Sequence, residues 1–361
     1  MKMCQAFAHN GHDIHLLVPN IFDDRETGVE DVHKYYGVEP CFTITYLPWP
    51  PIKGRAYFHG WFAARYSKNL KPDLVYGRNI IGCYFTSKVG LPVVFESHAP
   101  ITNSGKIASW LFNELLKQKS FSYLVVITQS LRQWYLKNYN IPTDKILVAA
   151  DGADLPKNTE HDQIDSFSPQ SADTFRVGYV GHLYPGKGME IISKLVVRCP
   201  DLEFHIVGGL EEDIRLWKNQ LQGYGNIIFH GYRPHRDIPK IMDEMNVLIS
   251  PSLRSIKLPG KKDTDISQWT SPLKIFEYMA ARKPIVASDV DVLREVLKNG
   301  RNALLCDPDD LEAWQWSLYR LRDCPNLSQA LSQNAYHDLK NRYCWKTRAK
   351  EVLTSVAFVN T

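Results

Sequence analysis

Short apolar runs alternate with longer amphipathic stretches along most of the chain. The runs are rich in Val, Ile, Leu and aromatic residues, and polar residues do not alternate with apolar ones within them. Runs of this kind are typical of parallel strands that helices cover on both faces of a sheet. The pattern predicts strands over residues 14–18, 43–47, 73–77, 92–96, 123–128, 145–150, 175–181, 203–209, 226–231, 246–252, 283–289 and 303–306.

The stretch 156–174 interrupts this rhythm. It is polar, rich in Ser, Asp and Pro, and has no periodic apolar face, which indicates a linker. We therefore expect an α/β protein with two doubly wound, Rossmann-like domains of parallel strands, one over 1–160 and one over 170–340. Ligands of doubly wound sheets bind beyond the carboxyl ends of the strands, so the active site is expected in a cleft between the two domains.

The two ends of the chain read as helices. Segment 341–361 is expected to be a terminal helix that crosses back to complete the first domain, because apolar residues recur in it at helical spacing, namely Trp345, Ala349, Val352 and Val356. At the N-terminus a helix and a turn, "MKMCQAFAHNGHD", precede the first strand. A doubly wound domain normally opens with a strand, so we expect either a missing edge strand or a natural start elsewhere.

Composition narrows the class of protein. The 361 residues are 44% hydrophobic and 23% charged, close to the averages of soluble globular proteins, and the length suits two domains. The formal charge of +4 is too small to predict a nucleic-acid partner. Seven scattered cysteines show neither disulfide nor zinc spacing, and no apolar run approaches the roughly 20 residues of a membrane span. We expect a reduced, cytoplasmic protein without a metal.

The first candidate site is "VGYVGHLYPGKGMEIISKL", residues 177–195, which reads as strand, glycine-rich turn and helix. Such a turn presents free backbone N–H groups and a helix N-terminus to a phosphate, and Lys187 adds a positive charge. The glycine spacing fits neither the dinucleotide fingerprint nor the P-loop, which disfavours a hydride-transferring dehydrogenase. A structural turn with a solvated lysine is the alternative interpretation.

The second candidate site is "SPLKIFEYMAARKPIVASD", residues 271–289. Ser271 is a good helix N-cap and Pro272 suits the first helical position. Lys274 then falls in the first turn and Glu277 lies on the neighbouring surface, which suits a phosphate and the hydroxyls of a ribose respectively. The alternative is a surface pair between Lys274 and Glu277 on a helix that buries Leu273, Phe276 and Ala280.

These motifs and their order resemble a known family. "FRVGYVGHLYPGKGM", "FHIVGG", "FHGYRPHRDIPKIM", "NVLISPS", "SPLKIFEYMAARKPIVASD" and "GRNALLCDPDD" look like the nucleotide-binding domain of the GT-B retaining glycosyltransferases, specifically glycosyltransferase family 4. "FESHAP" (95–100) and the stretch 125–155 resemble the first domain of the same family. The resemblance covers nearly the whole chain.

The resemblance implies roles for particular residues. Lys187 matches the lysine that neutralises the diphosphate, Glu277 the second glutamate of a Glu-x7-Glu motif that holds the ribose, and His98 a histidine near the donor sugar. These three are the expected catalytic residues. The expected donor-binding residues are Gly181, His182, Gly186, Gly188, Gly208, Tyr232, Arg233, Ser271, Pro272, Leu273 and Lys274, with Tyr232 and Arg233 in the loop that reads the base.

Two positions depart from the family pattern. His182 stands where the family usually has an arginine, so one charge on the diphosphate is lost or comes from Lys274. Trp269 stands where the first glutamate of Glu-x7-Glu should fall. Candidates to replace that glutamate are Asp263, Asp265 and Thr270.

The resemblance implies a retaining transfer of a hexose from a nucleotide diphosphate sugar, best guess UDP-glucose, to a polysaccharide or lipid-linked saccharide. It implies front-face attack, UDP as product, and neither a metal nor a further cofactor. Two alternatives are a sugar-nucleotide epimerase and a non-catalytic nucleotide-sugar binding protein.

A membrane surface is a further candidate partner. Segment 46–72 interleaves aromatic residues with Arg55, Arg65, Lys68 and Lys71, a combination that suits an anionic membrane surface. A helix that packs its aromatic residues into its own domain explains the segment equally well. The predicted location is therefore cytoplasmic, with peripheral attachment to the inner face of the plasma membrane as the open alternative.

Overall fold

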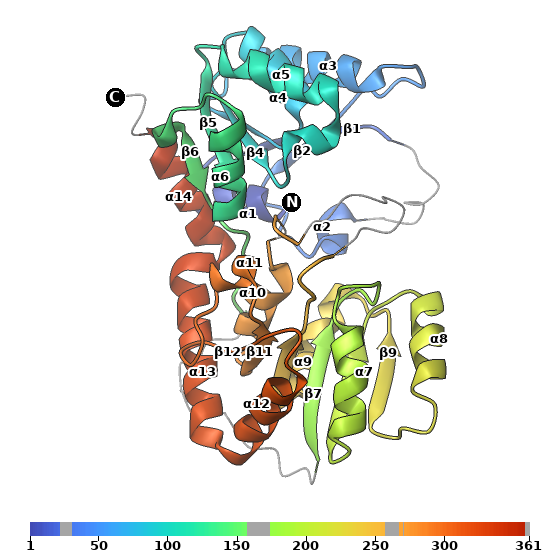
Figure 1. Ribbon diagram of the computed structural model, residues 1–361. Coiled ribbons are helices and arrows are strands. Elements are labelled where there is room, and N and C mark those ends of the chain that lie inside the picture. Colours follow the sequence, from blue (N-terminus) through green and yellow to red (C-terminus); the bar gives the residue numbers. More distant parts are fainter. Residues whose placement is uncertain (22–30, 157–173, 257–266, 270, 358–361) are drawn as a thin grey trace. The chain divides into compact units, whose positions relative to one another are not determined.

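The computed structural model describes residues 1–21, 31–156, 174–256, 267–269 and 271–357. The chain forms two compact units (Figure 1). Unit 1 contains residues 1–151 and the segment from Trp345 onward, and unit 2 contains Gly152–Cys344. The sequence placed the corresponding boundaries at 160 and 341. Most of the expected linker, 157–173, lies outside the described residues.

Unit 1 is built on parallel strands in two sheets. One sheet pairs β1 (His15–Pro19) with β2 (Thr43–Leu47), and the other has the order β3-β4-β5-β6. The strands of the second sheet are β3 (Val75–Gly77), β4 (Val93–Ser97), β5 (Phe121–Val126) and β6 (Ile146–Val148). The helices are α1 (Lys2–His9), α2 (Val32–Tyr35), α3 (Arg55–Leu70), α4 (Ile80–Lys88), η2 (Ile101–Ser104), α5 (Lys106–Leu116), α6 (Gln129–Asn138) and η3 (Thr143–Lys145).

The last helix, α14 (Trp345–Ala357), belongs to unit 1, as the apolar spacing predicted. It packs beside α1 (Figure 1). Ala349 and Val352 of α14 are fully buried in one core cluster with Phe7 of α1 and Val94 of β4. The two ends of the chain therefore share one hydrophobic core.

Unit 2 contains a single parallel sheet with the order β9-β8-β7-β10-β11-β12. The strands are β7 (Phe175–Val180), β8 (Leu202–Val207), β9 (Ile227–Gly231), β10 (Val247–Ser250), β11 (Ile285–Ser288) and β12 (Leu304–Cys306). The strand order reverses between β7 and β10, and ligands of doubly wound sheets bind at this switch point. The helices are α7 (Met189–Arg198), α8 (Glu211–Gln220), η4 (His235–Asp237), α9 (Ile238–Asp243), α10 (Leu273–Ala280), α11 (Asp291–Arg294), α12 (Leu311–Asp323), α13 (Pro325–Asp338) and the π-helix η5 (Leu339–Tyr343).

The prediction of two doubly wound α/β units is confirmed. Each of the predicted strands has a counterpart, and every strand pair is parallel. The inner strands β8, β10 and β11 of unit 2 are almost fully buried because helices cover the sheet, and this explains why their sequences do not alternate, whereas the edge strand β9 is partly exposed. None of the described helices is long and apolar enough to cross a membrane.

Candidate active site

The loops that follow β7 and β10 meet at the switch point of unit 2. The backbone N–H of Leu253 donates to the carbonyl oxygen of Gly186 over 3.0 Å. Gly188 has φ +119, and a Cβ at this position would lie 2.6 Å from the carbonyl oxygen of Pro251. Only glycine tolerates both the left-handed backbone and this close approach. The glycine-rich turn is therefore fixed against the neighbouring loop.

Gly208 makes a similar close approach after β8. It has φ +105, and a Cβ there would clash with the carbonyl oxygen of Gly181, the first residue after β7. Gly188 and Gly208 each allow two backbone segments to approach closely beyond the carboxyl ends of the strands. They shape this edge of the sheet.

Glu190, in the first turn of α7, closes the glycine-rich turn. Its carboxylate accepts hydrogen bonds from the backbone N–H of Gly186 over 2.7 Å and of Gly188 over 3.3 Å. The sequence predicted free N–H groups in this turn, and for these two glycines the prediction is wrong. Glu190 was missed as a functional residue, although an acidic residue just inside a helix start is a signal for such a cap.

Two lysines from distant parts of the chain come together beside this turn. Burial lowers the pKa of Lys187. Burial and then the positive charge of Lys187 lower the pKa of Lys274 to about 7, against the opposing charge of Glu277. Two mutually repelling ammonium groups in a partly buried position form a site that a dianionic phosphate would stabilise.

Tyr179 of β7 holds this arrangement. Lys274 Nζ donates to its hydroxyl over 3.2 Å and lies 4.3 Å from its ring centroid. The hydroxyl itself lies 2.7 Å from the carbonyl oxygen of His182 and 3.0 Å from that of Lys187, to which it donates. A fully buried tyrosine thus links the Lys274 ammonium group to the backbone of the glycine-rich turn. The His182 side chain is exposed, and its ring centroid lies 5.5 Å from that of Tyr184.

The start of α10 differs from the prediction. Pro272 has φ −82 and ψ 67, and the N–H of Leu273 donates to the carbonyl oxygen of Ser271 over 2.9 Å. These values describe an inverse γ-turn centred on Pro272. The helix therefore begins at Leu273, one residue later than predicted, with Pro272 and not Ser271 as its N-cap. The buried Ser271 hydroxyl has no hydrogen-bond partner among the described residues.

Glu277 contacts the loop that follows β9. Its Oε1 lies 3.1 Å from Nε2 of His235. The same loop carries Tyr232, which is 81% exposed, and the exposed Arg233. The alternative interpretation required a direct surface pair between Lys274 and Glu277. The two side chains instead contact Tyr179 and His235, and Leu273 is 48% exposed instead of buried. His235 was missed, although it lies in the quoted motif "FHGYRPHRDIPKIM".

Trp269 occupies the position expected for the first glutamate of Glu-x7-Glu. Trp269 is half-buried. Its suggested substitutes, Asp263, Asp265 and Thr270, lie outside the described residues.

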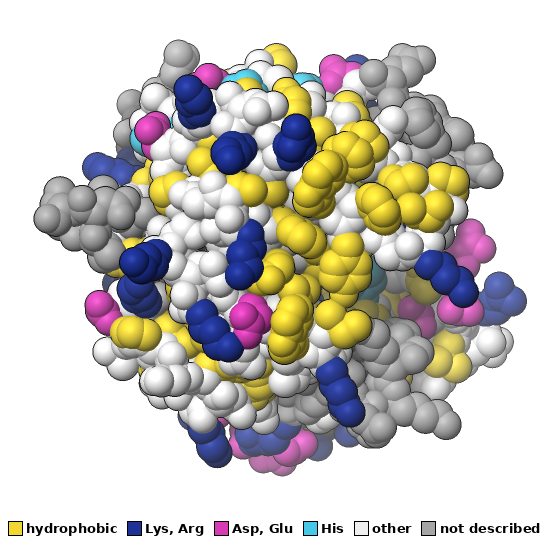
Figure 2. Space-filling view, turned by 90° about the horizontal axis from the view of Figure 1, so that it is seen from above, with side chains coloured by type: hydrophobic (Ala, Val, Ile, Leu, Met, Phe, Trp, Pro, Cys, Tyr) yellow, Lys and Arg dark blue, Asp and Glu magenta, His cyan; other side chains and the backbone are white. Residues whose placement is uncertain are grey.

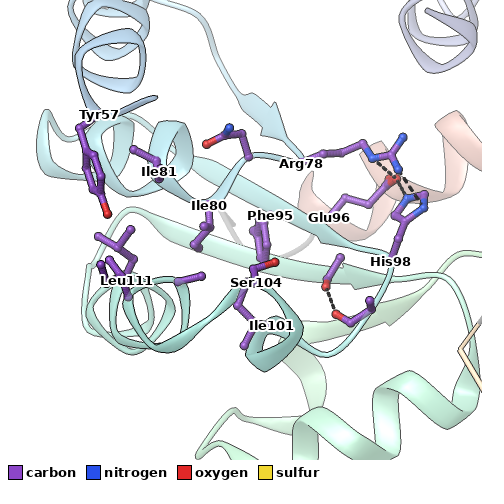
Figure 3. Close-up of a pocket in the computed structure, with 15 residues that line it drawn as sticks. Tyr57, Arg78, Ile80, Ile81, Phe95, Glu96, His98, Ile101, Ser104 and Leu111 are labelled. Carbon is purple, nitrogen blue, oxygen red and sulfur yellow. Dashed lines mark hydrogen bonds and ion pairs between the residues drawn. The ribbon is translucent and has the colours of Figure 1, made fainter. Parts of the chain in front are cut away.

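His98 lies in unit 1, at the end of β4, in a cluster of charged residues that the sequence did not predict (Figure 3). Nη2 of Arg78 donates to His98 Nδ1 over 2.9 Å. Because arginine has no acceptor atom, Nδ1 must accept, and the ring proton sits on Nε2, which donates to Glu96. His98 is thus held as one neutral tautomer.

Glu96 is buried and paired on both oxygens. Its Oε2 lies 3.0 Å from Nη2 of Arg348, which is itself buried on α14. Burial acts to raise the pKa of Glu96, but the hydrogen bond from His98 and the charge of Arg348 outweigh it, so the pKa is lowered. Single ligand atoms of Glu96, His98 and Asp151 lie within 4.8 Å of one another, a spacing that could hold a metal ion. Arg348 and Arg78 already supply positive charge there.

A cavity of about 530 Å³ opens beside this cluster. Its charged end is formed by Arg78, Glu96 and His98, and its other walls are mainly apolar (Figure 3). The apolar walls come from α3, α4, η2 and α5 and include Tyr57, Ile80, Ile81, Ile101, Ile107 and Leu111.

Models of two related families match the chain and together cover both units. Residues 1–157 match Glycosyltransferase Family 4, and residues 174–323 match Glycosyl transferases group 1. The chain belongs to glycosyltransferase family 4. The GT-B architecture, with its two Rossmann-like units, is that of the solved glycosyltransferase structures that this family 4 chain resembles.

Curated relatives of this family 4 chain are distant. An uncharacterized glycosyltransferase of Methanocaldococcus jannaschii is 25% identical over 64% of this chain and 57% of its own length. The phosphatidyl-myo-inositol mannosyltransferase of Mycolicibacterium smegmatis is 23% identical over 73% of this chain and 64% of its own length. The chain thus matches about three fifths of the length of these relatives.

The solved structures agree in fold. Anabaena HepE, in complex with UDP and glucose, superposes with a TM-score of 0.69 over 99% of this chain and 95% of its own, at 17% identity. The sucrose-phosphate synthase of Thermosynechococcus elongatus gives a TM-score of 0.71 at 15% identity, over 100% of this chain and 92% of its own.

Proposed function

We propose that the protein transfers a hexose from a nucleotide diphosphate sugar, with UDP-glucose as the best guess, to a polysaccharide or lipid-linked saccharide. The transfer retains the anomeric configuration, releases UDP, and needs neither a metal nor a further cofactor. The observation that carries this proposal is the convergence of Lys187 and Lys274 beside the glycine-rich turn at the switch point of unit 2.

The lysine pair suits the chemistry of the leaving group. When the bond to the sugar breaks, negative charge grows on the diphosphate while the sugar gains oxocarbenium character. Preorganised positive charge in a partly buried site lowers the energy of that state more than it lowers that of the bound donor. Lys274 is poised for this, because its pKa near 7 lets an arriving phosphate recharge it.

The nucleoside end of the donor is assigned to the Glu277 side of the site. A carboxylate accepts hydrogen bonds from two vicinal ribose hydroxyls, and Glu277 keeps one oxygen beyond the one that faces His235. The exposed loop with Tyr232 and Arg233 follows the neighbouring strand and is the proposed contact for the base. In front-face attack the leaving phosphate takes the proton of the acceptor, and His98 positions the donor sugar.

Relatives support the choice of donor and acceptor. Anabaena HepE was solved with UDP-glucose, and an Escherichia coli relative is named as a UDP-galactose transferase acting on a diphosphoundecaprenol-linked sugar. The matching families and the named relatives are glycosyltransferases, which does not favour an epimerase or a non-catalytic binding protein. We further propose that the protein works in the cytoplasm.

Two substitutions test the site. We expect Lys187→Ala and Glu277→Ala each to lower transfer from UDP-glucose at least a hundredfold, because one removes charge stabilisation and the other ribose binding. Lys194→Ala, which removes an exposed lysine from the same helix that follows the turn, should leave the rate unchanged. Transfer is measured as UDP release in the presence of a panel of saccharide and lipid-linked acceptors.

Normal turnover in both site variants would refute the site. UDP binding by calorimetry without any sugar release or transfer would instead favour the binding protein. Interconversion of the donor sugar without an acceptor would favour the epimerase.

A further inference from the structure

Helices α3, α4 and α5 of unit 1 expose a band of large apolar side chains. α4 packs against both α3 and α5, and Tyr84 of α4 lies 6.2 Å from Trp110 of α5, measured between ring centroids. Figure 2 looks down on this side of the molecule and shows hydrophobic side chains gathered in a continuous band with Lys and Arg side chains along it. The large apolar residues that are more than a third exposed on α3, α5 and the loop before α3 are Ile52, Tyr57, Phe58, Trp61, Leu70, Ile107 and Trp110. We call this surface the α3–α5 face.

Charge on and around the α3–α5 face is mainly positive. Residues 40–117 contain nine Lys and Arg residues against Asp73, the buried Glu96 and Glu114, which pairs with Lys117. Two of the arginines lie over aromatic rings: Arg65 over the exposed Trp61 at 5.8 Å and Arg55 over the half-buried Trp49 at 5.1 Å. Exposed aromatic residues among basic residues are complementary to the interface of an anionic lipid bilayer.

The cavity beside His98 reaches this face. Tyr57 and Ile107 both line the cavity and count among the exposed residues of the α3–α5 face, so the apolar end of the cavity opens there. The opposite end of the cavity is lined by polar and charged side chains. Arg78 is largely exposed, while the charges of Glu96, Asp151 and Arg348 are buried nearby. Two positive and two negative groups balance, so this end offers donors and acceptors without net charge and suits hydroxyl groups better than a free anion.

We propose that the α3–α5 face docks on an anionic lipid bilayer and that the cavity takes an amphipathic lipid acceptor from it. The hydrocarbon part of that lipid lies against the apolar walls between α3 and α5, and its hydroxylated head group lies toward Arg78 and His98. The size of the cavity, about 530 Å³, falls within the range of ligand sites for small molecules. The role of this lipid as the sugar acceptor rests on the proposed glycosyl transfer, whereas the docking of the protein on the bilayer does not.

The docking is tested by sedimentation of the full chain with vesicles. We expect binding to vesicles of phosphatidylcholine mixed with phosphatidylglycerol and at least tenfold weaker binding to phosphatidylcholine alone. The double variant Trp61→Ser with Trp110→Ser should lower the binding to mixed vesicles at least tenfold. Trp316→Ser is the matched control, because Trp316 of unit 2 is 57% exposed and also carries an arginine over its ring, and its binding should match that of the unchanged protein.

Two outcomes overturn the docking. One is equal binding of all variants, or no binding, to the mixed vesicles. The other is a dimer in solution that the double tryptophan variant dissolves, because a second copy of the chain would then cover the face. Donor turnover, measured in parallel without vesicles, separates a failure of this proposal from a failure of the glycosyltransferase assignment.

The cavity is tested with octyl glucoside below its micelle concentration. We expect calorimetric binding that is at least tenfold tighter than that of glucose, because only the octyl chain reaches the apolar walls. Ile107→Glu places a charge at the mouth of the cavity on an exposed position and should weaken octyl glucoside binding at least tenfold. Equal binding of octyl glucoside and glucose, or no effect of Ile107→Glu, would refute the assignment of the cavity.

Discussion

The pKa of Lys274 makes donor binding depend on pH in a defined way. With a pKa of about 7, Lys274 is mostly neutral at alkaline pH in the free protein. A bound diphosphate stabilises the ammonium form and therefore raises this pKa. Binding must then be accompanied by proton uptake, and the apparent Kd for UDP should be flat below about pH 7 and rise by about tenfold per pH unit above it.

The size of the proton uptake follows from the same value. At about pH 8 a group with a pKa of about 7 is about nine-tenths deprotonated, so binding should take up about 0.9 proton if the bound lysine is fully charged. The terminal phosphate of UDP contributes little at this pH, because the second ionisation of a phosphate monoester lies near 6.

Calorimetry measures the uptake directly. UDP is titrated into the protein in buffers that differ in ionisation enthalpy, such as Tris and HEPES, and the dependence of the observed heat on that enthalpy gives the number of protons. Lys274→Arg should abolish the uptake, since arginine stays charged throughout. Lys283→Arg is the control: Lys283 also has a pKa lowered by burial, but it precedes β11 at the opposite edge of the sheet. Uptake below about 0.2 proton, or uptake that survives Lys274→Arg, would contradict the charge model.

Two further predictions concern Arg348 and Glu190. Arg348→Met leaves the buried Glu96 charge without its arginine, which costs about 3–5 kcal/mol. Amide exchange in β4, measured by mass spectrometry, should therefore accelerate about 10²- to 10⁴-fold. Arg132→Met, at a half-buried arginine of α6, should leave that exchange unchanged, and equal exchange in both variants would contradict the reasoning. Glu190→Ala loosens the turn that presents Lys187 and should weaken UDP binding about tenfold, or about 1.4 kcal/mol, in calorimetry, whereas Glu212→Ala at the start of α8 should not. An unchanged affinity in Glu190→Ala would show that the turn needs no such clamp.

The fold was predictable because it depends on patterns within short segments. Apolar runs without alternation identified the strands of both units, and the helical spacing of Ala349 and Val352 identified the terminal helix. The site was predictable only in its parts. Lys187, Lys274 and Glu277 could be named from their motifs, but the contact of Lys274 with Tyr179 joins residues 95 positions apart and depends on the strand order.

The errors at the site are local in origin. Ser271 was predicted to cap α10 from its preference for that position, but the backbone of Pro272 forms a γ-turn that takes the first N–H to the Ser271 carbonyl oxygen. The N–H groups of Gly186 and Gly188 were predicted to be free, but Glu190 folds back onto them. Residue preferences describe averages over many sites and do not include the particular turn geometry that decides these cases.

The placement of α14 in unit 1 has a consequence for how the protein is made. Unit 1 buries Glu96 against Arg348 and closes its core with Ala349 and Val352, yet the ribosome adds these residues only after all of unit 2. Unit 2 is continuous in sequence and needs only its own residues to fold, whereas unit 1 must wait until the segment from residue 345 onward has been made, with a buried carboxylate still lacking its arginine. Released chains truncated before residue 345 should therefore carry a finished second unit and an unfinished first one, which makes the first unit the one exposed to chaperones and proteases.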